Sequence, residues 1–86
     1  VIASGDLVKV DVCVTHNGYC ADMARCYFVD TIDPEGQKLI EVAQKSLDKG
    51  IAQAVSGKRI SDISAAIQSE VQLYGYGIVR EFAGHG

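Results

Sequence analysis

The alternating side chains of residues 7–15, LVKVDVCVT, constrain the fold of this chain more than any other feature. Valine occupies every second position in this stretch, which is the period of a β-strand with one apolar face. Asn17 and Gly18 follow, and they are the preferred pair for a two-residue type I′ turn, in which both residues need a positive φ. The sequence therefore predicts a β-hairpin whose second strand runs from about Tyr19 to Val29.

Two aspartates lie in this hairpin, and the register of the turn decides whether they meet. A two-residue loop pairs Cys13 with Asp22 and Asp11 with Ala24 across the strands. Residues that are directly opposite, or two apart on one strand, share a face of the sheet. Asp11 and Asp22 are then diagonal neighbours on one face, roughly 7 Å apart at the backbone. A three-residue loop would shift the register by one residue and separate them.

Two ionised carboxylates at this separation repel one another, so either a shared proton or a cation is needed between them. A shared proton would support acid-base chemistry. A cation would support metal-assisted hydrolysis, for which paired metals roughly 3.5 to 4 Å apart are a standard arrangement. His85, in the closing GHG sequence, adds an imidazole nitrogen that suits a metal already held by oxygens. Asp11, Asp22 and His85 are therefore the candidate metal ligands.

The middle of the chain predicts two helices. Asp33 is a suitable N-cap with Pro34 in the first turn, and Gly57 is a plausible stop. The apolar residues of this first helix repeat at helical spacing: Leu39, Ile40, Ala43, Leu47, Ile51 and Ala54. A second helix begins near Ile60 or Ser61, within SGKRIS, and ends at Gly75, with a stripe of Ile60, Ile63, Ile67, Val71 and Tyr74. We expect both stripes to pack into a core.

A third strand is predicted over residues 77–82, GIVREF, which run into AGHG. The resulting order is β-β-α-α-β, an α+β arrangement in which the helices cover the apolar side of the hairpin. We expect the chain, which starts at Val1 and stops at the GHG sequence, to be a segment of a longer protein. At 86 residues it is one domain at most.

Composition excludes several classes of partner. The net charge is −3 without a run of Lys or Arg, which disfavours binding to nucleic acid or to anionic membranes. No apolar stretch approaches the roughly 18 residues of a membrane span, and no signal peptide is visible. Cys13, Cys20 and Cys26 lack C-x-x-C spacing, which suits a reducing cytosol and small core residues better than a disulfide framework or a zinc site.

Taken together, GDLVKVDVCVTHNGYCADMARCYFV, the two helices and YGIVREFAGHG resemble the central part of the methionine aminopeptidases, most closely the bacterial type I enzymes. The resemblance covers essentially the whole chain. It implies the pita-bread fold of the creatinase and aminopeptidase family, a site with two divalent metal ions, and hydrolysis of the initiator methionine from nascent proteins. It also implies a cytoplasmic enzyme with the ribosome as a further partner.

Position by position, the resemblance makes Asp11 the chelator of one metal, Asp22 the bridge between both, and His85 a ligand of the other. Cobalt, manganese, iron and zinc all suit such a site. A substrate-binding histidine upstream, and a second histidine and two glutamate ligands downstream, have no counterpart in residues 1–86. No glutamate of the chain fits the role of proton shuttle. We therefore expect a partial metallopeptidase catalytic domain, incomplete at both ends and inactive by itself.

The chain departs from the family pattern around the bridging aspartate. Cys20-Ala21 and Met23-Ala24 stand where relatives often carry His-Gly before it and Ser or Thr after it, and Ala83 replaces a common cysteine. Arg25 resembles part of the D-x-T-R pattern of Xaa-Pro peptidases, which share the fold and the metal ligands. An Xaa-Pro aminopeptidase or dipeptidase, and a non-catalytic binding protein of the same fold, are the alternative functions.

Overall fold

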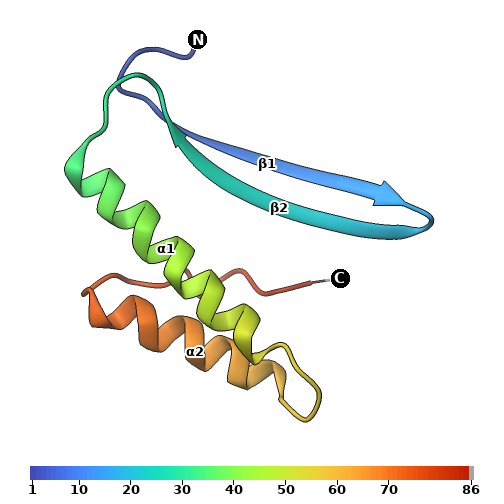
Figure 1. The fold of residues 1–86 in the computed structure, drawn as a ribbon. Helices are drawn as coiled ribbons and strands as arrows, with labels where there is room; N and C mark the ends of the chain where they lie inside the picture. The colour runs from blue at the N-terminus through green and yellow to red at the C-terminus, as the bar shows by residue number, and fades with distance from the viewer. Residues whose placement is uncertain (86) are drawn as a thin grey trace. The chain divides into compact units, whose positions relative to one another are not determined.

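The computed structural model of the chain describes residues 1–85, so that Gly86, the last residue of the GHG sequence, lies outside it. The elements follow one another as β1 (Leu7–His16), β2 (Tyr19–Phe28), α1 (Pro34–Gln53) and α2 (Ile60–Leu73), as Figure 1 shows. They form two compact units. Residues 1–37 with Gly84 and His85 make a hairpin unit, and residues 38–83 make a helical unit.

The hairpin has the predicted turn and the predicted register. Asn17 and Gly18 have φ angles of 50° and 81°, as a type I′ turn requires of both central residues. The antiparallel ladder then begins with His16 opposite Tyr19 and runs to Leu7 opposite Phe28. The second strand ends one residue before the predicted end. Pairing nevertheless continues just beyond the ladder, because the Val29 amide donates to the Asp6 carbonyl at 3.0 Å.

The hairpin buries few of its side chains. Val10, Val12 and Val14 are 43%, 48% and 55% exposed, so the expected burial of the valine face is not present in this structure. Cys13 and Cys20 are also exposed, and the prediction that they are core residues is therefore wrong. The physical reason is general: one strand pair cannot bury either of its own faces, since burial needs a second layer.

Both helices begin where the sequence predicts. The amide of Gly36 donates to the Asp33 carboxylate at 2.8 Å, which confirms Asp33 as the N-cap of α1. At the start of α2, the Arg59 amide donates to the carboxylate of Asp62 at 2.8 Å. This contact is half of a capping box and accounts for SGKRIS as a helix start. Neither helix among residues 1–85 is both long and apolar enough to cross a membrane.

The ends of the helices agree less well with the prediction. Helix α1 ends at Gln53, four residues before Gly57, whose φ of 88° lies in the turn that follows. Helix α2 ends at Leu73, and the Gly75 amide then donates to the Gln72 carbonyl at 3.0 Å. Gly75 has a φ of 75°, which confirms it as the residue that terminates α2.

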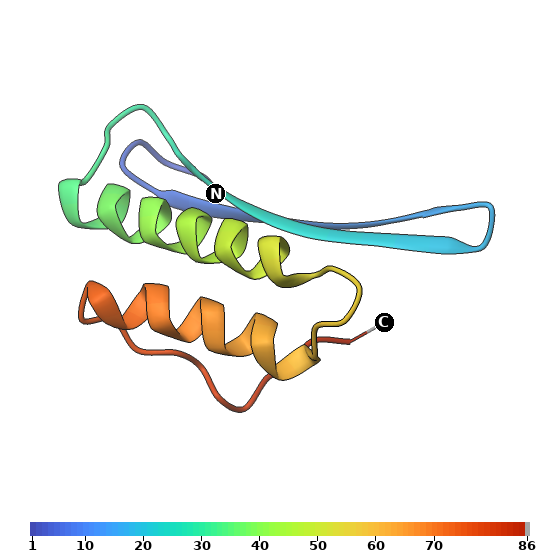
Figure 2. The same ribbon diagram turned by 60° about the horizontal axis from the view of Figure 1, so that its bottom comes forward.

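Figures 1 and 2 show α1 and α2 lying side by side, and small residues of α1 make this close approach possible. The buried positions of α1 are Val42, Ser46 and Gly50. A Cβ atom at Gly50 would lie only 2.8 Å from Cγ1 of Ile67, so a larger residue would force the Ile67 side chain or the helix that carries it to shift. Lys45 Nζ also lies 5.5 Å from the centre of the Tyr74 ring.

The predicted core stripe of α1 is wrong. Leu39, Leu47 and Ile51 are 46%, 44% and 60% exposed, whereas the buried row runs through Ser46 and Gly50. The prediction selects the face of α1 that carries large apolar side chains. Two helices in close contact instead favour small side chains where they meet. On α2 the prediction is better, because the middle of its stripe is half-buried: Ile63, Ile67 and Val71.

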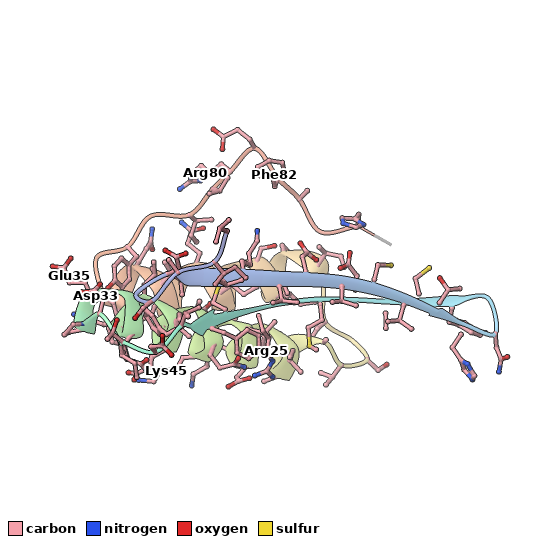
Figure 3. All side chains as sticks on the ribbon, turned by 90° about the horizontal axis from the view of Figure 1, so that it is seen from above. Arg25, Asp33, Glu35, Lys45, Arg80 and Phe82 are labelled. Atoms are coloured by element: carbon pink, nitrogen blue, oxygen red, sulfur yellow. The ribbon has the colours of Figure 1, made fainter. Side chains whose placement is uncertain are left out.

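The third predicted strand, over residues 77–82, is also wrong. The segment after α2 has no regular secondary structure in Figure 1. A strand requires a neighbour for its backbone hydrogen bonds, and the sheet within the described residues consists of β1 and β2 alone. Figure 3 labels Arg80 and Phe82 on this segment, where Phe82 is 83% exposed.

Candidate metal centre

The two aspartates of the hairpin lie on one face of the sheet, as the turn predicts. Asp22 is directly opposite Cys13, and Asp11 is directly opposite Ala24. Asp11 and Cys13 are two residues apart on β1 and therefore point to the same side. We call this side the acidic face, defined by Lys9, Asp11, Cys13 and Thr15 on β1 and by Cys20, Asp22, Ala24 and Cys26 on β2.

His85 comes back to this face from the far end of the chain. Its Nε2 lies 3.9 Å from Oδ2 of Asp22, a distance that suits an ion pair and is too long for a hydrogen bond. The two side chains are 75% and 47% exposed, so solvent reaches both. The structure thus brings together two of the three predicted ligands, from positions that are distant in the sequence.

Asp11 shares the face with Asp22, but the three side chains do not converge on one point. Among residues 1–85, no three His, Cys, Asp or Glu side chains lie close enough together to hold a metal ion. The chemistry of the donor set nevertheless fits divalent metal ions. Two carboxylates and one imidazole are the ligand types that first-row divalent metals accept, and the exposed Asp22 and His85 are accessible to them.

Beside the two aspartates, the acidic face carries the Thr15 hydroxyl, cysteine thiols and the Lys9 ammonium group. Thr15 is opposite Cys20, and its Oγ1 lies 3.7 Å from the Sγ of Cys20. On the acidic face, this pair follows the pair of Cys13 and Asp22 in the direction of the turn. Lys9 is opposite Cys26, beyond Asp11 as seen from the turn. Lys9 carries the one positive charge among these residues of the face.

Two further polar side chains of the chain are exposed and lie outside this arrangement. His16 is the exposed last residue of β1, and its Nε2 is 3.2 Å from Nδ2 of Asn17. Glu81 is exposed, and its carboxylate accepts a hydrogen bond from the Arg80 amide at 3.1 Å. The remaining glutamates are carried by the helices: Glu35, Glu41 and Glu70.

Comparison with known proteins identifies the family. The sequence matches the metallopeptidase family M24 over residues 1–86. It is 44% identical to a methionine aminopeptidase of Clostridium acetobutylicum over 100% of this chain and 34% of that protein. It is 45% identical to a methionine aminopeptidase of Borreliella burgdorferi over 99% of this chain and 34% of the relative.

A third relative is methionine aminopeptidase 1 of Bacillus subtilis, at 42% identity over 100% of this chain and 35% of that protein. The chain therefore spans about a third of the length of the curated relatives that it matches. The resemblance to bacterial methionine aminopeptidases, including type I enzymes, is confirmed by these identities. The chain belongs to metallopeptidase family M24, and its two strands followed by two helices are an α+β segment of the pita-bread fold of that family.

Proposed function

We propose that residues 1–86 are part of the catalytic domain of a methionine aminopeptidase, incomplete at both ends, which hydrolyses the N-terminal methionine from nascent proteins. The observation that carries this proposal is the identity of 42% to 45% with three bacterial methionine aminopeptidases over essentially the whole chain. The placement of Asp22 and His85 within 3.9 Å of each other supports a site at the acidic face.

Asp11, Asp22 and His85 would hold two divalent ions, drawn from cobalt, manganese, iron and zinc. Asp11 would hold one ion, Asp22 would be shared by both, and His85 would hold the other. When bound, such metals lower the pKa of water and polarise the scissile carbonyl. Both aspartates are then ligands and not proton carriers, because a carboxylate engaged with a cation is a poor base.

The hairpin positions the two aspartates and does not itself transfer protons. The ladder between β1 and β2 holds the aspartates on one face, and the two-residue turn fixes the register on which this depends. Proton transfer would fall to a glutamate outside residues 1–86. The glutamates on the helices and the exposed Glu81 have no place beside Asp22 in the family pattern, and none of them is assigned to the site.

The residues after Asp22 favour methionine removal over cleavage next to proline. Ala24 stands where the D-x-T-R pattern of Xaa-Pro peptidases has threonine, so Arg25 matches that pattern only in part. A binding protein without activity is disfavoured for a different reason, since all three ligand positions within residues 1–85 carry ligand residues.

A peptide assay on the purified full-length protein tests the proposal. We expect it to release methionine from Met-Gly peptides in the presence of added Co²⁺ or Mn²⁺, and to lose this activity when a chelator removes the metal. Xaa-Pro peptides should be cleaved much more slowly. Preferential cleavage of Xaa-Pro peptides would establish the alternative peptidase. If neither substrate is cleaved, with or without added metal, the binding protein is the better description.

The cellular setting belongs to the same proposal. A cytoplasmic enzyme acting on chains that emerge from the ribosome would meet N-terminal methionine as it is made. Its test is the N-terminal methionine content of total protein after depletion of the full-length enzyme. A rise in retained methionine is expected, and no change would contradict the proposed substrate.

Residues 1–86 alone should have no peptidase activity, because they carry three of the expected ligands and none of the downstream histidine and glutamate ligands. The measurement is methionine release from Met-Gly peptides by the soluble isolated chain with added Co²⁺ or Mn²⁺, with the full-length protein as the positive control. Metal-dependent cleavage by the isolated chain would show that the site is complete without the flanking sequence.

A further inference from the structure

Lys9 lies on the acidic face two residues from Asp11. Its cross-strand partner is Cys26, so the order along β1 away from the turn is Cys13, Asp11 and Lys9, all on one side. Positions two apart on a strand are separated by roughly 7 Å. Lys9 is exposed, and its side chain has the freedom to swing toward the aspartate pair.

We infer that the ammonium group of Lys9 lowers the affinity of the Asp11 and Asp22 pair for divalent cations. This inference rests on the proposed function, since it concerns the metal ions that these aspartates would hold. In the metal-free protein, Lys9 partly offsets the repulsion between the two carboxylates. When a divalent ion arrives, the same positive charge repels it, and the bound state is weakened relative to the free state.

The size of the effect follows from charge and distance. We take the spacing of alternate strand residues, roughly 7 Å, as the separation of the Lys9 ammonium and the ion. A single charge acting on a divalent ion at that separation in water changes the affinity about fourfold at low ionic strength. In 0.5 M salt the screening length is only about 4 Å, so the same interaction falls below about twofold. Dependence on salt therefore distinguishes the charge of Lys9 from a change in local structure.

Arg25 offers a matched control within the same hairpin. It is opposite Val10, on the valine face, and is exposed like Lys9. Figure 3 labels it. Removing the charge of Lys9 or of Arg25 changes the net charge of the protein equally. The two substitutions differ in the face from which the charge is removed, which is the variable that the inference concerns.

The experiment is calorimetric titration of the metal-free full-length protein with Mn²⁺, at about 20 mM and at 0.5 M salt. We compare the original protein with K9Q, K9R and R25Q. At low salt, K9Q should bind Mn²⁺ about fourfold more tightly, K9R should match the original protein, and R25Q should change the affinity by less than about twofold. At high salt the difference between K9Q and R25Q should largely disappear.

Thermal unfolding gives a second measure. K9Q should lower the melting temperature of the metal-free protein more than R25Q does, and should enlarge the rise that saturating Mn²⁺ produces. Equal effects of K9Q and R25Q on Mn²⁺ affinity, or weaker binding by K9Q, would overturn the inference while leaving the metal site in place. Absence of Mn²⁺ binding by the original protein would instead overturn the proposed function itself.

Discussion

The hairpin unit carries the proposed metal ligands, whereas the helical unit carries the buried packing. The hairpin carries two exposed aspartates and the histidine contact at 3.9 Å, yet its valines are mostly exposed. The helical unit contains the buried positions of the described chain, Val42, Ser46 and Gly50, and supplies no candidate ligand. In the helical unit, the close contact between α1 and α2 determines which side chains are buried. In the hairpin, the turn determines the face on which each side chain lies.

This contrast teaches that the two units specify their structures by different means. Backbone geometry determines the hairpin, because positive φ angles at Asn17 and Gly18 set the register and hence the face of each aspartate. Side-chain volume determines the helical pair, because Gly50 leaves room for Ile67. Substitutions can therefore remove function without loss of stability in one unit, and stability without loss of chemistry in the other.

The largest expected effect is that of Asp22→Asn on catalysis by the full-length protein. If Asp22 holds metal as proposed, its loss should lower the rate of methionine release by about 10³-fold, which corresponds to several kcal/mol of transition-state stabilisation. Unfolding by denaturant should be nearly unchanged, since Asp22 is exposed. Asp30→Asn is the matched control, because Asn tolerates the φ of 61° at this exposed position. Full activity of D22N would break the assignment of chemistry to the hairpin.

The next effect is that of Gly50→Ala on stability. The added Cβ would lie 2.8 Å from Ile67, and we expect the free energy of unfolding to fall by about 1 to 3 kcal/mol. Gly77→Ala is the control, because a Cβ at that position meets nothing within 4 Å and its φ is not in the left-handed region. Denaturant titration of the full-length protein measures both. A G50A protein as stable as G77A would show that the helices are not in close contact.

A smaller effect is expected for Gly18→Ala in the turn. The φ of 81° is unfavourable for a residue with a Cβ, at a cost of about 1 to 2 kcal/mol in the free energy of unfolding. Nothing lies within 4 Å of the new atom, so backbone conformation is the only cause. Asn17→Gly keeps the turn and should cost less than G18A. Equal losses in the two variants would mean that the turn geometry does not determine the hairpin.

The smallest effect concerns Lys45, whose ammonium lies 5.5 Å from the centre of the Tyr74 ring. Replacing it in Lys45→Gln should lower the free energy of unfolding by about 0.5 kcal/mol. Lys49→Gln, one turn further along α1, removes the same charge away from the ring and should be neutral. If both variants lose the same stability, general electrostatics and not the ring contact is responsible.

The sequence predicts the hairpin well because its determinants are local. The turn at Asn17 and Gly18, the alternation of β1 and the cap at Asp33 each depend on neighbouring residues, and each is confirmed. The shared face of Asp11 and Asp22 follows from the register alone. The roles of these residues as metal ligands remain a proposal, because they depend on partners from outside the described residues.

The rest of the fold depends on contacts that one sequence does not reveal. A stripe of large apolar residues predicts that a face is buried but not by what, and in α1 the helix contact uses Ser46 and Gly50 instead. The strand expected over residues 77–82 needs a neighbouring strand, and its composition does not supply one. Burial of Cys13 fails for the same reason, since it requires a layer over the acidic face.

A sheet of two strands has consequences for handling the chain. Each of β1 and β2 has one long edge whose amides and carbonyls meet no further strand among residues 1–85. Such open edges, beside exposed valines, are templates for pairing with other molecules. We therefore expect residues 1–86, when expressed alone, to aggregate edge to edge as their concentration rises, and expression with flanking segments that cover those edges to restore solubility.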